Sequence, residues 1–517
     1  MTMHQPDQVA SLKRSARILL LPFSIALSLV LFVLLPEARQ NWELAIVFRG
    51  TSVVLCLWCL LLWQHTRRTG RSLAVDIQLK RQHYLQACVQ SALLLYWGWY
   101  WPPVYAWLPM LLAQLLFAYA FDLLLNWSRR DTAPLGFGQF PIVFSINLFL
   151  WFKPDWFALQ FGLVALGLTA KEFLRWNKDG RSAHIFNPSS FPLALYSVFL
   201  LATGGTGITW GQEIATTQFY PPHMYLVLFL AGLPGQFFFG VTTMTMSAVL
   251  STILFGWIYF AATGVYFFYD SYIPISVFLG MHLLFTDPAT APRSPLGRVL
   301  YGVFYGLSTV ALYEWLGAAG LPTFYDKLLQ VPLMNLSVRA IDRLAQRVHW
   351  PALRNNLAYM SVWALAFAGL SFTQAVGDDH PGQWLPFWTR ACDDGRSYAC
   401  PYLADMELEL CNRGSGWACN EAGLMDIALS RSGEDRRRLN SADAATPFRQ
   451  GCELGVPAAC QNVSTLAAGQ QNFVTAQPAL DDYPILLRGS KGEIPERGPE
   501  ALYALACRQG WPSTCSK

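Results

Sequence analysis

Residues 104–126 read VYAWLPMLLAQLLFAYAFDLLLN, and Asp122 is their single charged side chain. A helix of this length rises about 35 Å, enough to cross the bilayer core of about 30 Å. The stretch therefore predicts a transmembrane helix. Over the whole chain we expect about thirteen spans, at 18–36, 44–63, 84–101, 104–126, 140–152, 156–174, 187–203, 223–239, 241–262, 272–286, 299–318, 322–338 and 356–376. The predicted fold class is an all-α, polytopic membrane protein.

The composition agrees with this class. Of 517 residues, 53% are hydrophobic and 14% are charged, whereas an average soluble domain is about 25% charged. This excludes an ordinary soluble enzyme, a disordered chain and a nucleic-acid binder built on basic patches. The formal net charge of +4 hides an uneven division, because residues 1–377 hold 24 Lys and Arg against 15 Asp and Glu, and residues 378–517 hold 13 against 18.

Loop charge predicts the orientation, since cytoplasmic loops collect Lys and Arg. With the N-terminus inside, 20 of the 24 basic residues before residue 378 fall in predicted inside segments. An odd number of spans then puts the C-terminal region outside. Lys13, Arg14 and Arg17 precede the first span, which we interpret as an uncleaved anchor. We expect a protein of a bacterial inner membrane, in contact with membrane lipid, with a periplasmic C-terminal domain.

Two predicted spans are short. Residues 140–152 (FPIVFSINLFLWF) and 273–285 (IPISVFLGMHLLF) reach only about 20 Å as helices. Each is the third of five spans in one half of a ten-span unit, and an odd number per half gives the halves opposite orientations. Short, Pro-interrupted segments at matching positions of inverted halves indicate a site near the midplane. They either cross the bilayer or re-enter; alternatively, both are buried core helices.

Two motifs fall on the predicted cytoplasmic side. In the first, at 181–191, Asn187 can cap a helix that starts at Pro188, leaving N–H groups that suit an anion. The alternative is simply a well-capped helix. In the second, at 282–302, Asp287 lies beside a span, where a carboxylate usually has a partner. It can cap the next turn, bind a cation, or pair with Arg293 or Arg298.

These motifs resemble a known family. The matching residues are Phe186-Asn187-Pro188-Ser189-Ser190-Phe191, Thr286-Asp287-Pro288-Ala289-Thr290, Gly297-Arg298, Tyr301-Gly302, Pro332 to Asn335, and Asp342. Together they look like the RnfD/NqrB-like family, membrane proteins of Rnf complexes and of the sodium-pumping NADH:quinone oxidoreductase, and most closely its UnbU-like branch, which is found with enediyne biosynthesis genes. The resemblance covers residues 84–347. It implies a ten-helix inverted-repeat core that binds flavin and passes electrons together with the other proteins of a complex.

The resemblance also implies a cofactor site. Its residues would be Asn187, Ser189, Ser190, Thr286, Asp287 and Thr290. The family attaches FMN to a Thr in a Ser-Gly-Ala-Thr motif, which this sequence lacks, so we expect FMN or riboflavin without a covalent bond. Haem is not expected: without a Cys-x-x-Cys-His motif it could not be attached covalently, and His184, His223 and His282, which lie at or near predicted spans, fit ordinary capping or packing roles better than iron ligation. No metal is expected either, since Cys56 and Cys59 lack a second ligand pair.

The C-terminal region repeats a cysteine pattern four times. Each copy reads C-x-x-G-x-x-x-[AT]-C, and the pairs are Cys392 with Cys400, Cys411 with Cys419, Cys452 with Cys460, and Cys507 with Cys515. The Gly ends one helix and the second Cys lies early in the next, so a disulfide within each pair would join the two helices. Disulfides persist in oxidising compartments; zinc is the alternative.

This pattern resembles the cysteine-rich Sel1-like repeats, relatives of tetratricopeptide helical pairs. Such helical repeats usually bind partner proteins, so we expect a periplasmic protein partner. The predicted domains are an N-terminal tail with two extra helices (1–83), the ten-helix core (84–347), a last helix with a linker (348–380) and the repeats (381–517). Residues 465–500 form an insertion.

Three functions remain open at this point. The first is an electron-transfer component of a multi-subunit membrane assembly that uses non-covalent flavin or a similar redox ligand. The alternatives are a transporter or channel-like protein, and a non-catalytic membrane anchor that recruits partners. The sequence contains no G-x-S-x-G motif and no phosphate-binding loop. If the chain takes part in catalysis, it does so as the redox component of a membrane oxidoreductase complex.

Overall fold

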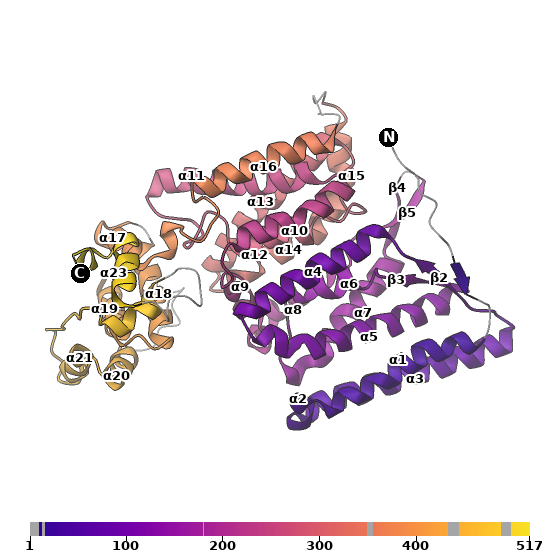
Figure 1. Cartoon of the computed structure of the whole chain (residues 1–517), viewed down its shortest axis with the longest axis horizontal. Coiled ribbons are helices and arrows are strands. Elements are labelled where there is room, and N and C mark those ends of the chain that lie inside the picture. Colours follow the sequence, from indigo (N-terminus) through magenta and orange to yellow (C-terminus); the bar gives the residue numbers. More distant parts are fainter. Residues whose placement is uncertain are drawn as a thin grey trace.

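The chain forms a bundle of long helices with a separate helical domain at one end (Figure 1). The computed structural model describes residues 10–12, 16–178, 180–348, 355–396, 398–432, 444–487 and 498–516. Lys13, Arg14 and Arg354, which contribute to the predicted loop charge, lie outside the described residues. Short strands lie at the end of the bundle opposite the helical domain, and we call this the strand end.

The N-terminal part and the first half of the bundle contain β1 (Ala10–Leu12), η1 (Ala16–Leu19), α1 (Leu20–Ser28), η2 (Leu29–Leu34), α2 (Pro36–Gln40), α3 (Trp42–Thr69), β2 (Ala74–Gln78), α4 (Arg81–Tyr100), α5 (Pro103–Arg129), β3 (Thr132–Gly136), α6 (Phe140–Asn147), η3 (Pro154–Trp156), α7 (Phe157–Phe173), β4 (Arg175–Lys178), β5 (Arg181–His184) and α8 (Ser190–Thr203). The connection to the second half contains η4 (Gly205–Ile208) and α9 (Gly211–Thr217).

The second half contains α10 (Met224–Phe239), α11 (Thr242–Thr263), α12 (Ile275–Leu279), the π-helix η5 (Gly280–Leu284), α13 (Pro295–Ala318), η6 (Thr323–Tyr325), α14 (Asp326–Leu329) and α15 (Val331–Ala345), and α16 (Asn356–Phe372) follows it. The C-terminal domain contains η7 (Pro381–Gln383), α17 (Leu385–Asp393), α18 (Ala399–Asn412), α19 (Gly416–Ser432), α20 (Ala445–Glu453), α21 (Pro457–Ala467), η9 (Leu480–Asp482), α22 (Tyr483–Leu486), α23 (Pro499–Arg508) and η10 (Pro512–Thr514).

The expectation of thirteen spans is not supported. Among the described residues, four helices are both long and apolar enough to cross a membrane, namely α3, α5, α11 and α13. Five further apolar helical segments are shorter, such as α8 and α16. All thirteen predicted segments contain helix, but several break or start late. Residues 322–338, for example, comprise η6, α14 and the start of α15 rather than one helix.

The all-α prediction holds for most of the chain but misses five short strands. β2 lies between β1 and β3, antiparallel to the first and parallel to the second. β4 and β5 form an antiparallel hairpin, in which Arg175 lies opposite His184. Gly180 in its turn has a φ of 76°, which glycine adopts at low cost. The strands connect helices at the strand end, where the segments between apolar helices pair with one another.

The short segment at 140–152 begins as a helix and then breaks. Buried amide side chains bond the backbone groups that the break leaves without helical partners. Helix α6 ends at Asn147, and residues 148–152 are not helical. The Gln160 side chain accepts from the Phe152 N–H at 3.0 Å, and Gln218 donates to the Leu148 carbonyl at 2.6 Å. Non-helical backbone that is buried away from water requires such internal partners. Gln114 joins the network by accepting from Asn147 Nδ2 at 2.7 Å.

The two halves of the bundle contact each other through matching helices. α4 packs on α10, the first helix of each half, and α8 packs on α14 and α15, the last helices. The additional helices flank this core on opposite sides: α1 and α3 lie beside α5, and α16 lies along α10 and α11 (Figure 1). Gly302 permits the close crossing of α13 and α11, since a Cβ there would lie 2.2 Å from the Met244 carbonyl oxygen.

The four predicted disulfides are present, each between cysteines eight positions apart. The glycine of every copy has a positive φ, from 68° at Gly395 to 103° at Gly414, as a C′ glycine requires. The N–H of the residue that follows this glycine donates to a carbonyl in the last turn of the helix, as the Ser415 N–H does to the Leu410 carbonyl. The first two copies lie close in sequence because α18 carries both Cys400 and Cys411.

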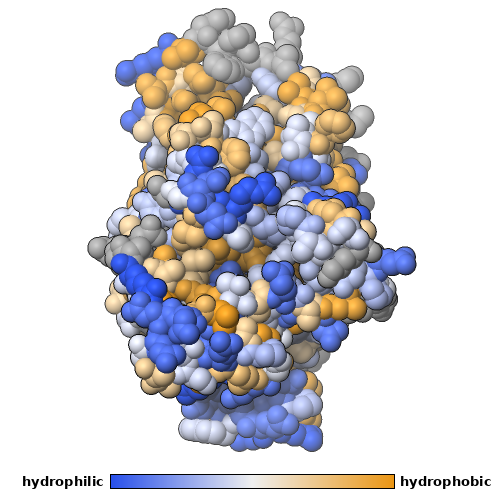
Figure 2. Space-filling model, turned by 90° about the vertical axis from the view of Figure 1, so that its left-hand side faces the viewer, coloured by the Kyte–Doolittle hydropathy of each residue, from blue (hydrophilic) through white to orange (hydrophobic). Residues whose placement is uncertain are grey.

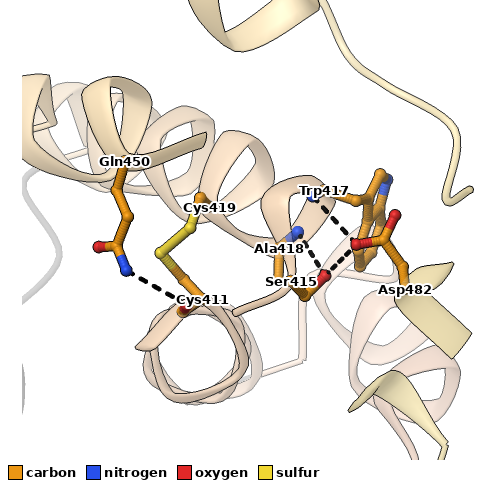
Figure 3. Close-up of a disulfide and its surroundings, with 7 residues drawn as sticks. All are labelled: Cys411, Ser415, Trp417, Ala418, Cys419, Gln450 and Asp482. Carbon is orange, nitrogen blue, oxygen red and sulfur yellow. Dashed lines mark hydrogen bonds between the residues drawn. A yellow bond between two sulfur atoms is a disulfide. The ribbon is translucent and has the colours of Figure 1, made fainter. Parts of the chain in front are cut away.

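The insertion at 465–500 is anchored to the second copy (Figure 3). The Asp482 carboxylate accepts from the Ser415 hydroxyl at 2.6 Å and from the Trp417 N–H at 3.4 Å, next to the bridge from Cys411 to Cys419. Gln450 of α20 donates to the Cys411 carbonyl at 3.3 Å. The repeat domain, residues 381–516 as described, is therefore held by bridges and by hydrogen bonds between its segments.

The repeat domain packs on the loop between α11 and α12 rather than hanging from a free linker. Tyr269 of this loop stacks on Tyr402 of α18, with ring centroids 4.1 Å apart. His380 in the connecting segment is buried against Tyr266, at 4.3 Å between centroids. Viewed from this end, apolar residues gather along the upper edges of the molecule and between groups of hydrophilic residues lower down, and the lowest part is hydrophilic (Figure 2).

Apolar side chains on the outside of the bundle match a lipid environment. On α3, Trp42 is 70% exposed and Leu61 is 65% exposed, and on α16 Phe372 is 90% exposed. Soluble monomers rarely expose contiguous apolar surfaces of this kind. These helices are therefore suited to association with a membrane.

Candidate functional site

A polar cavity of about 250 Å³ lies at the strand end, and we call it the strand-end cavity. Its lining comes from both halves of the bundle: Gln82, His83 and Gln86 on α4, Gly138 before α6, Pro141, Ile142 and Ser145 on α6, Lys171 on α7, His184 on β5, Asn187 to Ser189 before α8, Phe239 on α10, Leu283 on η5, and Thr286 to Ala289 after it. The two short segments, around α6 and η5, therefore meet at one cavity.

Asn187 fixes the geometry where the halves meet. Its Oδ1 accepts from the N–H groups of Ser189 and Ser190, at 2.9 and 3.1 Å, and its Nδ2 donates to the Leu284 carbonyl at 2.9 Å. Its own N–H donates to Oδ1 of Asn335 at 3.1 Å. Asn187 thus caps the turn that leads into α8. Since its side chain occupies these N–H groups, they are not free for an anion, which corrects that expectation.

Asp287 pairs across the halves with a histidine. Its Oδ2 lies 2.7 Å from Nε2 of His184, and its Oδ1 accepts from the Ala289 N–H at 2.9 Å. Asp287 therefore caps the next turn, one of the expected roles. Pairing with Arg298 is wrong, because that guanidinium donates to the carbonyls of Pro292 and Gly240. Lys171 also lines the cavity, so its titratable side chains are one amine, two imidazoles and one carboxylate.

A polar face on α4 continues from this cavity into the bundle. Gln82, Gln86 and Gln90 are spaced by four residues and so share one side of the helix. Gln90 Nε2 donates to the Ser145 hydroxyl at 2.9 Å, whereas its Oε1 has no hydrogen-bond partner among the described residues. The Nε2 atom of His282 is likewise buried without one, while its Nδ1 bonds the Phe278 carbonyl at 2.8 Å.

The structure brings together part of the predicted site. Asn187, Ser189, Thr286 and Asp287 all line the strand-end cavity. Ser190 is buried beside it, and Thr290 bonds the Asp287 carbonyl instead; neither is among the lining residues. The sequence reading of the site missed His83, Lys171 and the glutamines. The spacing of those glutamines by four residues on a predicted span was a signal that could have found them.

The side chains of the cavity suit a ring with hydrogen-bonding edges. The amides of Gln82 and Gln86 both donate and accept, and the hydroxyls of Ser145 and Thr286 add polar groups, as the polar edge of a flavin requires. Ligand sites that enclose a drug-sized molecule have about 300–1,000 Å³, so this cavity accommodates a ring system rather than a whole nucleotide. Among the described residues, no group of three or more His, Cys, Asp or Glu could hold a metal ion.

A second and larger cavity, of about 510 Å³, lies at the opposite end, between the bundle and the repeat domain; we call it the repeat-side cavity. Its lining includes Pro274, Ser276 and Val277, which precede or belong to α12. The segment of α12 and η5 therefore borders one cavity at each end. Comparison of the chain with models of protein families, with curated proteins and with solved structures returned no match.

Proposed function

We propose that this chain is a multi-pass component of a bacterial inner-membrane assembly and that its strand-end cavity holds a non-covalent flavin or a similar redox ligand for electron transfer. The observation that carries the proposal is the meeting of the two short helical segments, α6 and the run of α12 and η5, at one polar cavity. Such a convergence is typical of ligand sites in membrane transporters with inverted repeats. The likeness to the RnfD/NqrB-like family supports the choice of a flavin.

The contacts between the halves support an inverted repeat. First helix packs on first and last on last, as a pseudo-two-fold axis requires. The basic loops support the orientation with the strand end in the cytoplasm. Arg129 and Arg130 both pair with Glu172 there, and Arg71 pairs with Asp131 at 2.7 Å. The repeat domain then faces the periplasm, where its disulfides persist.

The proposed roles of the residues follow from their contacts. Asn187 and Asp287 hold the backbone of the two halves in register, so the cavity keeps its shape. Gln82, Gln86 and Thr286 bind the polar edge of the ligand, and Lys171 compensates negative charge that forms on it. A bound flavin would accept and donate electrons. The chain supplies position, hydrogen bonds and exclusion of water.

The visible absorption spectrum of the purified protein, oxidised and then reduced with dithionite, tests this proposal. We expect a flavin absorption band that bleaches on reduction. Denaturation should release the flavin into solution, because it is not covalently bound. Asp287→Asn should lose most of the band, whereas Asp131→Asn, which removes an exposed carboxylate at the same end, should keep it. A colourless, correctly folded protein from its native membrane would refute the flavin assignment, and a Soret band would replace it with haem.

Transport is the second candidate function, and the position of α12 and η5 between the two cavities favours it. The test is labelling with a membrane-impermeant maleimide in proteoliposomes, in a chain without Cys56, Cys59 and Cys88. Ser145→Cys reports on the strand-end cavity and Ser276→Cys on the repeat-side cavity. Labelling of both positions from both faces supports alternating access, whereas labelling of each from its own face alone contradicts it.

Whether the chain transfers electrons or transports a substrate, we propose that its repeat domain recruits a periplasmic protein. Helical repeats commonly bind partners along their packed surface. Cross-linking of the intact chain in cells, compared with a chain that ends at residue 380, tests this role. A partner that is captured equally by both chains would show that the repeats do not recruit it.

A further inference from the structure

The repeat-side cavity is rich in aromatic rings and in carboxylates. Phe219, Tyr220, Phe268, Tyr313 and Phe324 line its wall on the bundle side. Phe268 and Tyr313 pack edge to face, with centroids 4.9 Å apart. Tyr269 and Tyr402, which also line it, join the bundle to the repeat domain through their stacked rings. The cavity therefore takes its wall from both the bundle and the repeat domain.

The charged groups in the lining are three carboxylates and two cations. The carboxylates are Asp270, Asp326 and Glu409, and the cations are Lys327 and Arg413. Lys327 is already held: its Nζ lies 3.2 Å from Asp326 Oδ1 and donates to the Phe324 carbonyl at 2.6 Å. Asp326 and Lys327 are no more than 2% exposed, so this pair is part of the wall. Over the whole lining, three carboxylates against two cations leave an excess of one negative charge.

A ligand for this cavity must match both features. The faces of aromatic rings carry negative potential and attract cations that lie within about 6 Å of the ring centroid. Carboxylates attract the same ligands over a longer range and repel anions. A volume of about 510 Å³ is within the range of sites that enclose small organic molecules. An inorganic cation would leave most of this space and the rings unused.

We propose that the repeat-side cavity binds an organic ammonium ion, with its cationic head against the rings around Tyr313 and near Asp270, and that the repeat domain closes the site. The site is separate from the strand-end cavity and does not depend on the proposed electron-transfer role. Because Tyr402, Glu409 and Arg413 come from α18 and its C-terminal end, the repeat domain contributes part of the lining as well as covering it.

Calorimetric titration of the purified full-length chain in detergent with choline tests this proposal. The control ligand is 3,3-dimethylbutan-1-ol, which has the same shape without the charge. We expect choline to bind and the alcohol to bind at least tenfold more weakly. Tyr313→Leu should weaken choline binding by about 2- to 30-fold, the effect of one ring contact. Asp270→Asn should weaken it too, whereas Asp393→Asn, an exposed carboxylate outside the cavity, should not.

Equal binding of choline and the alcohol would overturn the proposal, because the cavity would then recognise only apolar shape. Absence of choline binding, or tighter binding of acetate, would overturn it as well. If Tyr313→Leu does not fold, Asp270→Asn and its control carry the test alone. These titrations need no flavin, so their failure leaves the electron-transfer proposal standing, and the reverse also holds.

Discussion

The bridge between Cys411 and Cys419 should stabilise the repeat domain more than the bridge between Cys507 and Cys515, although both close loops of equal length. Each pair is eight positions apart. The loss of loop-closure entropy in the unfolded chain is then about 8.3 cal/mol/K, which gives about 2.5 kcal/mol at 25 °C for either bridge. This common contribution makes the two pairs matched controls for each other.

The difference between the bridges comes from packing. Cys411 and Cys419 are fully buried between α18 and α19, with the Gln450 amide on the Cys411 carbonyl. Cys515 is exposed and Cys507 is half-buried. Replacing both buried cysteines with Ala leaves a void of roughly two sulfur atoms, and at about 24 cal/mol per Å³ this costs about 1 kcal/mol more.

Hydrogen exchange of the intact chain, read by mass spectrometry on peptides of α18, α19 and α23, measures both effects as local opening. Cys507→Ala with Cys515→Ala should raise exchange in α23 by about 70-fold, the equivalent of 2.5 kcal/mol. Cys411→Ala with Cys419→Ala should raise exchange in α18 and α19 by about fivefold more than that. Equal increases for the two double variants, or no increase for either, would refute the reasoning.

Three further predictions concern packing, capping and pH. Gly302→Ala should destabilise the bundle by about 1–3 kcal/mol, because its Cβ would lie 2.2 Å from the Met244 carbonyl oxygen; the thermal midpoint in detergent measures this, and an unchanged midpoint would contradict the close crossing. Asn187→Ala should lower the free energy of unfolding by about 1–3 kcal/mol in the same assay, whereas Asn187→Asp keeps the capping oxygen and should lower it less. Equal decreases for the two variants would mean that the cap contributes nothing. In the repeat domain, burial raises the pKa of Glu407 well above its usual value and the pKa of Asp405 to about 7. Folding therefore favours protonation of these carboxyl groups, so the stability of the repeat domain falls as pH rises from about 4.5 upward. Hydrogen exchange of α18, corrected for intrinsic rates, should quicken from pH 5 to pH 8, and Glu407→Gln should reduce this dependence on pH. A pH dependence that the substitution leaves unchanged would contradict the assignment.

Local patterns in the sequence correctly predicted the helix ends and the cysteine pairs of the C-terminal domain. The Cys-x-x-Gly spacing indicated helix ends, and Gly395 and Gly414 adopt the positive φ that such ends need. The cysteine pairs also followed from the pattern, because eight residues around one helix end bring the two side chains together whatever the rest of the fold does. This information lies within a few residues and does not depend on tertiary context.

The bundle was predicted less well because apolar composition does not reveal where a helix breaks. Residues 148–152 are as apolar as a helix interior, yet they are not helical. Their backbone groups bond the side chains of Gln160 and Gln218 instead. Those partners come from other segments, so no local pattern shows them. The same applies to the site: Asp287 pairs with His184, which is 103 positions away in the sequence, rather than with an arginine nearby.

The central claim is that the two halves of the bundle enclose a ligand in the strand-end cavity. Electron cryo-microscopy of the chain purified from its native membrane into nanodiscs tests this most directly. We predict ring-shaped density between Gln86, Asn187 and Thr286, and loss of that density in Asp287→Asn. A map that resolves these side chains around an empty, water-filled cavity would contradict the account.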